Sequence, residues 1–126
     1  MATDESIESG DGWSVAALGD LGRGPGFRKI RRELGIEAFG VNAIVIPPGY
    51  DTGYHYHDTQ QELYLVLQGT VEIGFGDGTT HRLEPGGLAR VDAPVHRKVM
   101  NVGEGDATYV VVGGWGGYVG RDGREP

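Results

Sequence analysis

The stretch that decides the fold is GYDTGYHYHDTQQELYLVLQG, residues 49–69. It contains His55 and His57, which are separated by one residue, and Glu62 at the head of the next apolar run. In an extended strand, side chains i and i+2 point to the same face, so both imidazoles are expected to project together. Glu62 is in reach across the short DTQQ connection. Imidazole and carboxylate groups suit Fe, Mn, Ni and Zn without any sulfur ligand, so the stretch predicts a metal site.

Short apolar runs flank this stretch on both sides. FGVNAIVIPPG precedes it, and TVEIGFGDG, TTHRLEPGG, LARVDAP, HRKVMNVG and ATYVVVGG follow it. Each run is closed by Gly, Pro or Asp, and the runs recur at intervals of about ten residues, which is typical of successive strands. Phe75 to Thr79 fits a hairpin loop, because Gly and Asp tolerate the positive φ of such turns. The pattern predicts an all-β sandwich or barrel.

The ends of the chain differ from this central part. Residues 1–12 are acidic and are expected to form a mobile tail. In FRKIRRELG, apolar residues at spacings of three and four before Gly35 predict a short helix, whose basic residues are expected to face solvent. The predicted organisation is an N-terminal tail and extension over 1–35, a barrel over 36–118 and a flexible C-terminal tail over 119–126.

Composition excludes several classes of function. The chain has 126 residues, which favours one domain, and contains no Cys, which excludes disulfides and thiolate metal sites. With 11 Lys and Arg against 18 Asp and Glu, the net charge is −7, which argues against sequence-independent nucleic-acid binding. No apolar run reaches the ~18 residues of a membrane span, and the acidic N-terminus lacks the apolar segment of a signal peptide. We therefore expect a cytoplasmic protein without nucleic-acid or membrane partners.

The stretch from Gly49 to Gly69 resembles the first signature of the cupin superfamily. That signature reads Gly, five residues, His-x-His, three or four residues, Glu, six residues and Gly, and this chain matches it without a gap. The second signature is only partly present in VDAPVHRKVMN, which keeps Pro94, His96 and Asn101. The Gly between Pro and His is missing, and the Asn comes one residue late. The turn before His96 is therefore shortened.

The resemblance implies a fold, a metal site and a choice of functions. The fold would be all-β, a cupin-type double-stranded jelly-roll β-barrel with a short N-terminal helix or extension. One divalent metal ion (Fe, Mn, Ni or Zn) would be bound by His55, His57, Glu62 and His96, with coordination positions left open for a ligand. The function would be that of a metal-dependent enzyme of dioxygenase, decarboxylase or isomerase type on a small organic substrate. The alternative is a non-catalytic domain that binds or senses a small molecule.

Alternation along the run that follows Glu62 predicts two faces. If Glu62 points inward, so does Tyr64, a candidate for the pocket wall. The other face would carry Leu63, Leu65 and Leu67, which are too apolar to remain in water. They are expected to pack on the facing strand of a second subunit or beneath the N-terminal segment. Exposed apolar patches of this kind commonly mark interfaces, so we favour a homodimer.

Alternation also predicts which residues after His96 face the pocket. With His96 inward, Lys98 and Met100 would share its face and would be further pocket candidates. Lys98 is then expected to hold an anionic substrate near the metal. A bulge at the shortened turn would invert this assignment.

Overall fold

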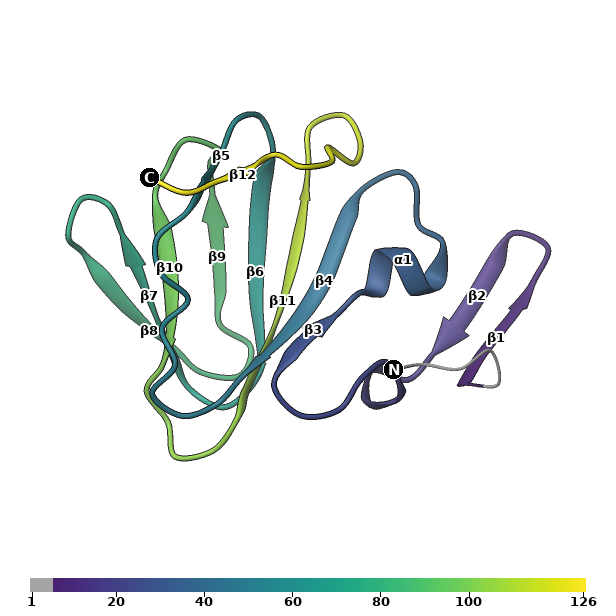
Figure 1. Ribbon diagram of the computed structural model, residues 1–126, viewed down its shortest axis with the longest axis horizontal. Helices are drawn as coiled ribbons and strands as arrows, with labels where there is room; N and C mark the ends of the chain where they lie inside the picture. Colours follow the sequence, from purple (N-terminus) through teal and green to yellow (C-terminus); the bar gives the residue numbers. More distant parts are fainter. Residues whose placement is uncertain (1–5) are drawn as a thin grey trace.

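The computed structural model describes residues 6–126, so the first five residues of the expected acidic tail lie outside it. Most of the ordered segments are strands, with one short α-helix and a 3-10 turn at Leu18–Asp20 (Figure 1). The strands are β1 (Ile7–Gly10), β2 (Trp13–Ala16), β3 (Gly26–Arg28), β4 (Gly40–Ile46), β5 (Tyr56–His57), β6 (Gln61–Gln68), β7 (Val71–Phe75), β8 (Thr80–Leu83), β9 (Leu88–Val91), β10 (Arg97–Asn101), β11 (Ala107–Gly114) and β12 (Gly123–Arg124). The helix is α1 (Ile30–Leu34). No helix of the described part is long and apolar enough to cross a membrane.

Two main sheets organise the molecule. The larger has the antiparallel order β3-β4-β11-β6-β9, and the smaller has the order β10-β7-β8. Isolated bridges at Asp51 and His55 attach the segment before β5 to β10. The described strands therefore form a mostly-β, jelly-roll-like fold, but their pairing leaves separate sheets rather than a closed barrel. This differs from the closed form that the resemblance implied.

The core lies between the two sheets. Alternation in β6 buries Glu62, Tyr64 and Val66, as the sequence pattern predicted. They are joined in the core by apolar residues of other strands, including Ile46, Ile73, Val99 and Tyr109. The β6–β7 turn needs a glycine, because Gly69 has φ +79° and an added Cβ would lie 2.9 Å from the Cα of Ala107. The metal-binding signature thus ends where only Gly fits.

The N-terminal part forms a hairpin and a helix beside the larger sheet. Strands β1 and β2 pair with each other and project to one side of the molecule (Figure 1). Helix α1 ends at Gly35, which adopts a left-handed conformation with φ 73°, as the sequence predicted. One of the basic residues of FRKIRRELG does not face solvent, contrary to expectation. Arg28 is buried, because its guanidinium donates a hydrogen bond to the Gly24 carbonyl at 2.7 Å.

The residues expected to form a flexible tail, 119–126, are placed against the body of the protein. Gly123 pairs with His57 and Arg124 pairs with Tyr56, so β12 extends β5 into a two-stranded sheet (Figure 1). Asp122 is buried beneath this pairing. The C-terminal segment therefore contributes directly to the surroundings of His57.

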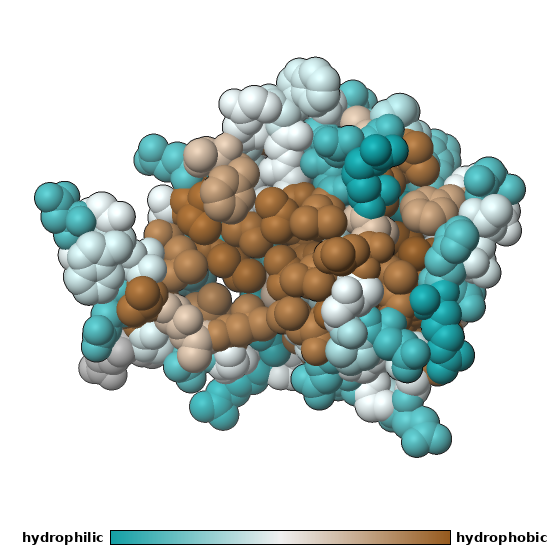
Figure 2. Space-filling view, turned by 180° about the vertical axis from the view of Figure 1, so that it is seen from behind, coloured by the Kyte–Doolittle hydropathy of each residue, from teal (hydrophilic) through white to brown (hydrophobic). Residues whose placement is uncertain are grey.

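The outer face of the larger sheet is apolar. Figure 2, which views the molecule from behind, shows a broad hydrophobic area bordered by polar residues. On β6 and β9, the outward residues Leu63, Leu67 and Leu88 are 42%, 45% and 61% exposed. Register places half-buried neighbours on the same face, namely Val41, Val45, Leu65, Val110 and Val112.

Candidate metal centre

His55, His57 and Glu62 converge at one end of the space between the sheets. One ligand atom from each residue lies within 4.8 Å of the others. His57 is in β5, Glu62 is near the start of β6, and His55 is held beside β10 by backbone hydrogen bonds with Arg97. The two imidazole rings meet edge to face, with centroids 5.3 Å apart. Local spacing in the signature and the turn between β5 and β6 thus produce the cluster that the sequence predicted.

Glu62 is the most connected member of this cluster. Its Oε1 accepts a hydrogen bond from the Tyr64 hydroxyl at 2.9 Å, and its Oε2 accepts one from Nε2 of Gln60 at 3.0 Å. Nε2 of His57 lies 3.3 Å from Oε2, and Nη2 of Arg97 lies 3.5 Å from Oε1. Burial alone would raise the pKa of Glu62, but these donors and charges outweigh it and lower the pKa. Glu62 is therefore a carboxylate, the form that binds a cation.

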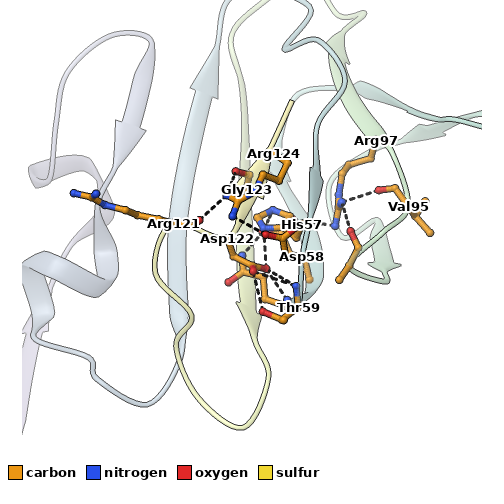
Figure 3. A network of polar contacts seen from close by, with 12 residues as sticks. His57, Asp58, Thr59, Val95, Arg97, Arg121, Asp122, Gly123 and Arg124 are labelled. Atoms are coloured by element: carbon orange, nitrogen blue, oxygen red, sulfur yellow. Dashed lines mark hydrogen bonds and ion pairs between the residues drawn. The ribbon is translucent and has the colours of Figure 1, made fainter. Parts of the chain in front are cut away.

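His57 is oriented by a carboxylate on each side. Its Nε2 faces Glu62, while its Nδ1 lies 3.6 Å from Oδ2 of Asp122 (Figure 3). Asp122 in turn accepts hydrogen bonds from the backbone N–H groups of Thr59 and Gln60 at 2.9 and 2.7 Å. Burial would raise the pKa of Asp122, but these hydrogen bonds lower it. Sequence reasoning missed Asp122, because an Asp in the glycine-rich GRDG segment has the composition of a turn.

His55 is kept in its neutral form by its surroundings. Burial lowers its pKa, and the positive charge of Arg97 lowers it further. A neutral imidazole has a free lone pair, which a metal ion requires. His55 is therefore ready to act as a ligand at a pH where a solvated histidine would begin to take up a proton.

The structure does not bring His96 to this cluster. His96 stacks on Tyr56 with centroids 4.8 Å apart, whereas its neighbour Arg97 is fully buried beside Glu62. Backbone pairing explains the difference, because directly paired residues of antiparallel strands share a face, and His55 pairs with Arg97. Nη1 of Arg97 also donates to the carbonyl of Val95 at 2.7 Å, within the shortened turn.

The expected parity of β10 is consequently inverted. Arg97, Val99 and Asn101 are the buried residues of this strand, and Lys98 and Met100 lie on its other face. Nζ of Lys98 pairs with Asp51 at 3.1 Å and lies 5.0 Å from the centre of the Tyr54 ring. Neither Lys98 nor Met100 lines the cavity described next, whereas Tyr64 does.

A cavity of about 1090 Å³ opens beside the cluster. Its apolar wall includes Ile44, Ile46, Val99 and Val111, together with the rings of Tyr64 and Tyr109. Its charged lining is mainly basic, with Lys29, Arg31, Arg32, Arg121 and Arg124 against Glu62, Asp122 and Glu125. Five of the 11 Lys and Arg thus line the cavity, against three of the 18 Asp and Glu, although the chain as a whole is acidic.

The residues present fit a divalent metal ion. Two imidazoles and one carboxylate are a common ligand set for such ions, and their ligand atoms are close enough to share one cation. The carboxylate of Asp122 lies 3.6 Å from Nδ1 of His57, on the side where metal-bound histidines generally have a hydrogen-bond acceptor. Arg97 opposes this tendency, because a buried cation near the ligands repels a second one.

Comparison with known proteins agrees with this architecture. The solved structures that resemble the chain include a protein with a double-stranded β-helix domain from Klebsiella pneumoniae, with a TM-score of 0.69, 21% identity and coverage of 81% of this chain and 84% of that one. They also include a cupin protein from Bacteroides fragilis, with a TM-score of 0.68, 17% identity and coverage of 81% and 83%. An oxalate oxidase in complex with the substrate analogue glycolate matches with a TM-score of 0.56 and 19% identity over 60% of this chain.

The lengths differ among these relatives. The chain spans 41% of the oxalate oxidase, and between 44% and 56% of three further matched structures. No curated protein matches the sequence. The family model of the cupin domain matches residues 42–113, which is more than half of the chain and includes the whole His55–His57–Glu62 cluster. The protein belongs to the cupin family.

Proposed function

We propose that this protein is a metal-dependent cupin enzyme that acts on a small anionic organic molecule. The observation that carries the proposal is the convergence of His55, His57 and Glu62 on a large cavity. A divalent metal held there would polarise a bound oxygen atom or activate water or dioxygen. Two histidines and one carboxylate are also the ligands of many non-haem Fe(II) oxygenases. Among dioxygenase, decarboxylase and isomerase chemistry, the ligand set therefore favours a dioxygenase.

The charge of the cavity supports an anionic substrate. Lys29 and Arg32 are exposed, and Arg31 lies with its guanidinium 4.0 Å from the centre of the Tyr118 ring. Cations gathered in a cleft raise the local concentration of anions even when the protein is acidic overall. These residues take the place of Lys98, which the sequence had suggested for this role. The match to an oxalate oxidase solved with glycolate, a small carboxylate, is in keeping with this substrate class.

The other walls suit the organic part of such a substrate. The isoleucine and valine side chains of β4, β10 and β11 exclude water from one side of the cavity. Tyr64 holds its proton, because burial and the nearby Glu62 charge raise its pKa well above the usual value. Its hydroxyl therefore orients Glu62 as a hydrogen-bond donor.

One observation favours the alternative, a non-catalytic domain that binds or senses a small molecule. Both oxygens of Glu62 already have protein donors, from Tyr64 and Gln60, and Arg97 lies beside them. Such a network satisfies the buried carboxylate without a metal. A domain that only binds its ligand would need no more than this.

We also propose that a second copy of the chain covers the outer face of the larger sheet. This face exposes three leucines and lies on the side of the molecule that Figure 2 shows as predominantly apolar. Exposed apolar areas with a polar border commonly mark protein interfaces. A cytoplasmic location and the absence of nucleic-acid and membrane partners remain predictions of the sequence.

Turnover under defined metals tests the enzymatic proposal. Protein stripped with a chelator is reloaded separately with Fe²⁺, Mn²⁺, Ni²⁺ or Zn²⁺ and incubated with glycolate, oxalate and other small carboxylates, with their uncharged amides as controls. Oxygen uptake and NMR of the products are measured. We expect turnover of a carboxylate with one of the metals and none in His55→Ala. Thermal stabilisation by a carboxylate without product under every metal would support the binding alternative instead.

A further inference from the structure

The C-terminal segment, residues 119–126, lies across the strand that carries His57. Gly123 pairs with His57, and the N–H of Asp58 donates to the Asp122 carbonyl at 3.2 Å. Nη2 of Arg124, two residues after Asp122, forms an ion pair with Oδ2 of Asp58 at 2.6 Å (Figure 3). Asp122 is thus attached through its own carbonyl and through the two residues that follow it.

Asp122 faces a nitrogen that has no other partner. Nδ1 of His57 is buried and makes no hydrogen bond within residues 6–126, while Oδ2 of Asp122 lies 3.6 Å away. Thr59 and Gln60 donate four hydrogen bonds to the Asp122 carboxylate, at 2.7 to 3.1 Å, and these fix its position. The carboxylate is therefore a rigid acceptor directed at the back of the ring.

The chemistry of imidazole connects this contact to the ligand atom. A neutral imidazole carries one N–H and one lone pair, and a metal binds the nitrogen with the lone pair. Nε2 of His57 faces Glu62, so the proton must lie on Nδ1 if Nε2 is the ligand. An acceptor at Nδ1 favours this tautomer and fixes the plane of the ring.

We propose that Asp122 is a positioning residue that accepts a hydrogen bond from the Nδ1–H of His57 and thereby makes Nε2 the metal ligand. The metal affinity of the centre then depends on a segment more than 60 residues away in the sequence. This inference rests on the proposed metal site, and it assigns to the C-terminal segment a role that its composition does not suggest.

Binding of Zn²⁺ to matched variants, with an NMR assay of the tautomer, tests the inference. Asp122→Asn keeps the shape of the side chain and an oxygen that can accept the Thr59 and Gln60 hydrogens, but it removes the negative charge beside Nδ1, and a neutral amide oxygen is a weaker acceptor. By calorimetry we expect 10- to 100-fold weaker Zn²⁺ binding, roughly the effect of losing an outer partner of a metal-bound histidine. Arg124→Ala removes the ion pair between Arg124 and Asp58, which is another attachment of the C-terminal segment, and leaves the contact between Asp122 and His57 in place. It should change the affinity by less than about fivefold, as for an exposed ion pair.

The NMR readout separates positioning from anchoring. In ¹⁵N-labelled wild-type protein with Zn²⁺, long-range ¹H–¹⁵N spectra should show His57 with a protonated Nδ1 and a coordinated Nε2. Coordination through Nδ1, an unchanged affinity in Asp122→Asn, or an equal loss in Arg124→Ala would each overturn the inference. The wild-type spectrum decides the tautomer even if Asp122→Asn does not fold. If the wild-type protein binds no Zn²⁺, the proposed metal site itself is wrong. If it binds Zn²⁺ but gives one of the three results above, only the proposed role of Asp122 is wrong.

Discussion

Nη2 of Arg97 lies 3.5 Å from Oε1 of Glu62, and the Arg97 side chain is fully buried. The sequence had placed the imidazole of the neighbouring residue, His96, at this centre. A guanidinium is always charged, so it cannot act as a ligand and it repels a metal ion. The centre therefore has two histidines, one carboxylate and a fixed positive charge.

Replacing Arg97 should affect metal binding and stability in opposite directions. Arg97→Met removes the repelling charge, so we expect Zn²⁺ affinity to rise at least tenfold, because a unit charge a few ångströms from a divalent ion costs about 2 kcal/mol even at the dielectric constant of water. The metal-free protein should lose about 3 kcal/mol, because one partner of a buried ion pair is removed. Calorimetry and urea unfolding measure the two effects.

Arg82→Met is the control for this change. Arg82 is exposed on β8 in the smaller sheet, so its removal should alter neither quantity measurably. Weaker Zn²⁺ binding in Arg97→Met would mean that the guanidinium supports the centre rather than opposing the metal.

Tyr64→Phe should remove one of the hydrogen bonds that position Glu62 and so destabilise the protein. The variant deletes the hydroxyl that donates to Oε1 at 2.9 Å and leaves a buried carboxylate with one fewer donor. We expect a loss of about 2 kcal/mol in the free energy of unfolding, the range of hydrogen bonds to charged groups. Tyr109→Phe is the matched control, because Tyr109 stacks on Tyr64 with centroids 6.0 Å apart but does not donate to Glu62. Equal losses in both variants would contradict the assignment.

The stability of the metal-free protein should fall in acid in two stages. The pKa of His55 is lowered from 6.5 in the folded protein, so below pH 6.5 the unfolded chain binds this proton first and is favoured. The pKa of Glu62 is lowered from 4.5, so the stability it contributes is lost as pH falls below 4.5.

Urea unfolding at a series of pH values between 8 and 3 measures this profile. His55→Asn should remove the first stage and keep the second, while wild-type protein shows both. If the variant and the wild-type protein lose stability in parallel between pH 6.5 and 5, the lowered pKa of His55 is not the cause.

A charge on the outer face of the larger sheet should prevent self-association. Leu63→Glu places a carboxylate in the apolar area that a second copy would cover. Light scattering coupled to size-exclusion chromatography should give a dimer for wild-type protein and a monomer for the variant. Val102→Glu, at an exposed position outside that sheet, should remain a dimer. A monomeric wild-type protein would show that this face is not a dimer interface.

The sequence predicted the parts of the site that depend on local spacing. His55, His57 and Glu62 lie within eight residues, and the alternation of β6 follows from its own pattern. Which residues of β10 face inward could not be predicted in the same way, because this depends on which residue after the shortened turn pairs with His55. Asp122 was missed for a related reason. Its place depends on the long-range pairing of β12 with β5, and a glycine-rich segment has no periodicity that would indicate a strand.

Metal stoichiometry in the wild-type protein and in single-ligand variants tests the central claim most directly. Chelator-treated protein is dialysed at pH 7.5 against a small excess of Zn²⁺ and analysed by elemental mass spectrometry, with His96→Ala as the control beside His57→Ala and Glu62→Gln. We expect one ion per chain in the wild-type protein and in His96→Ala, and strongly reduced content in the other two. Equal metal content in all four proteins, or none in the wild-type protein, would contradict it.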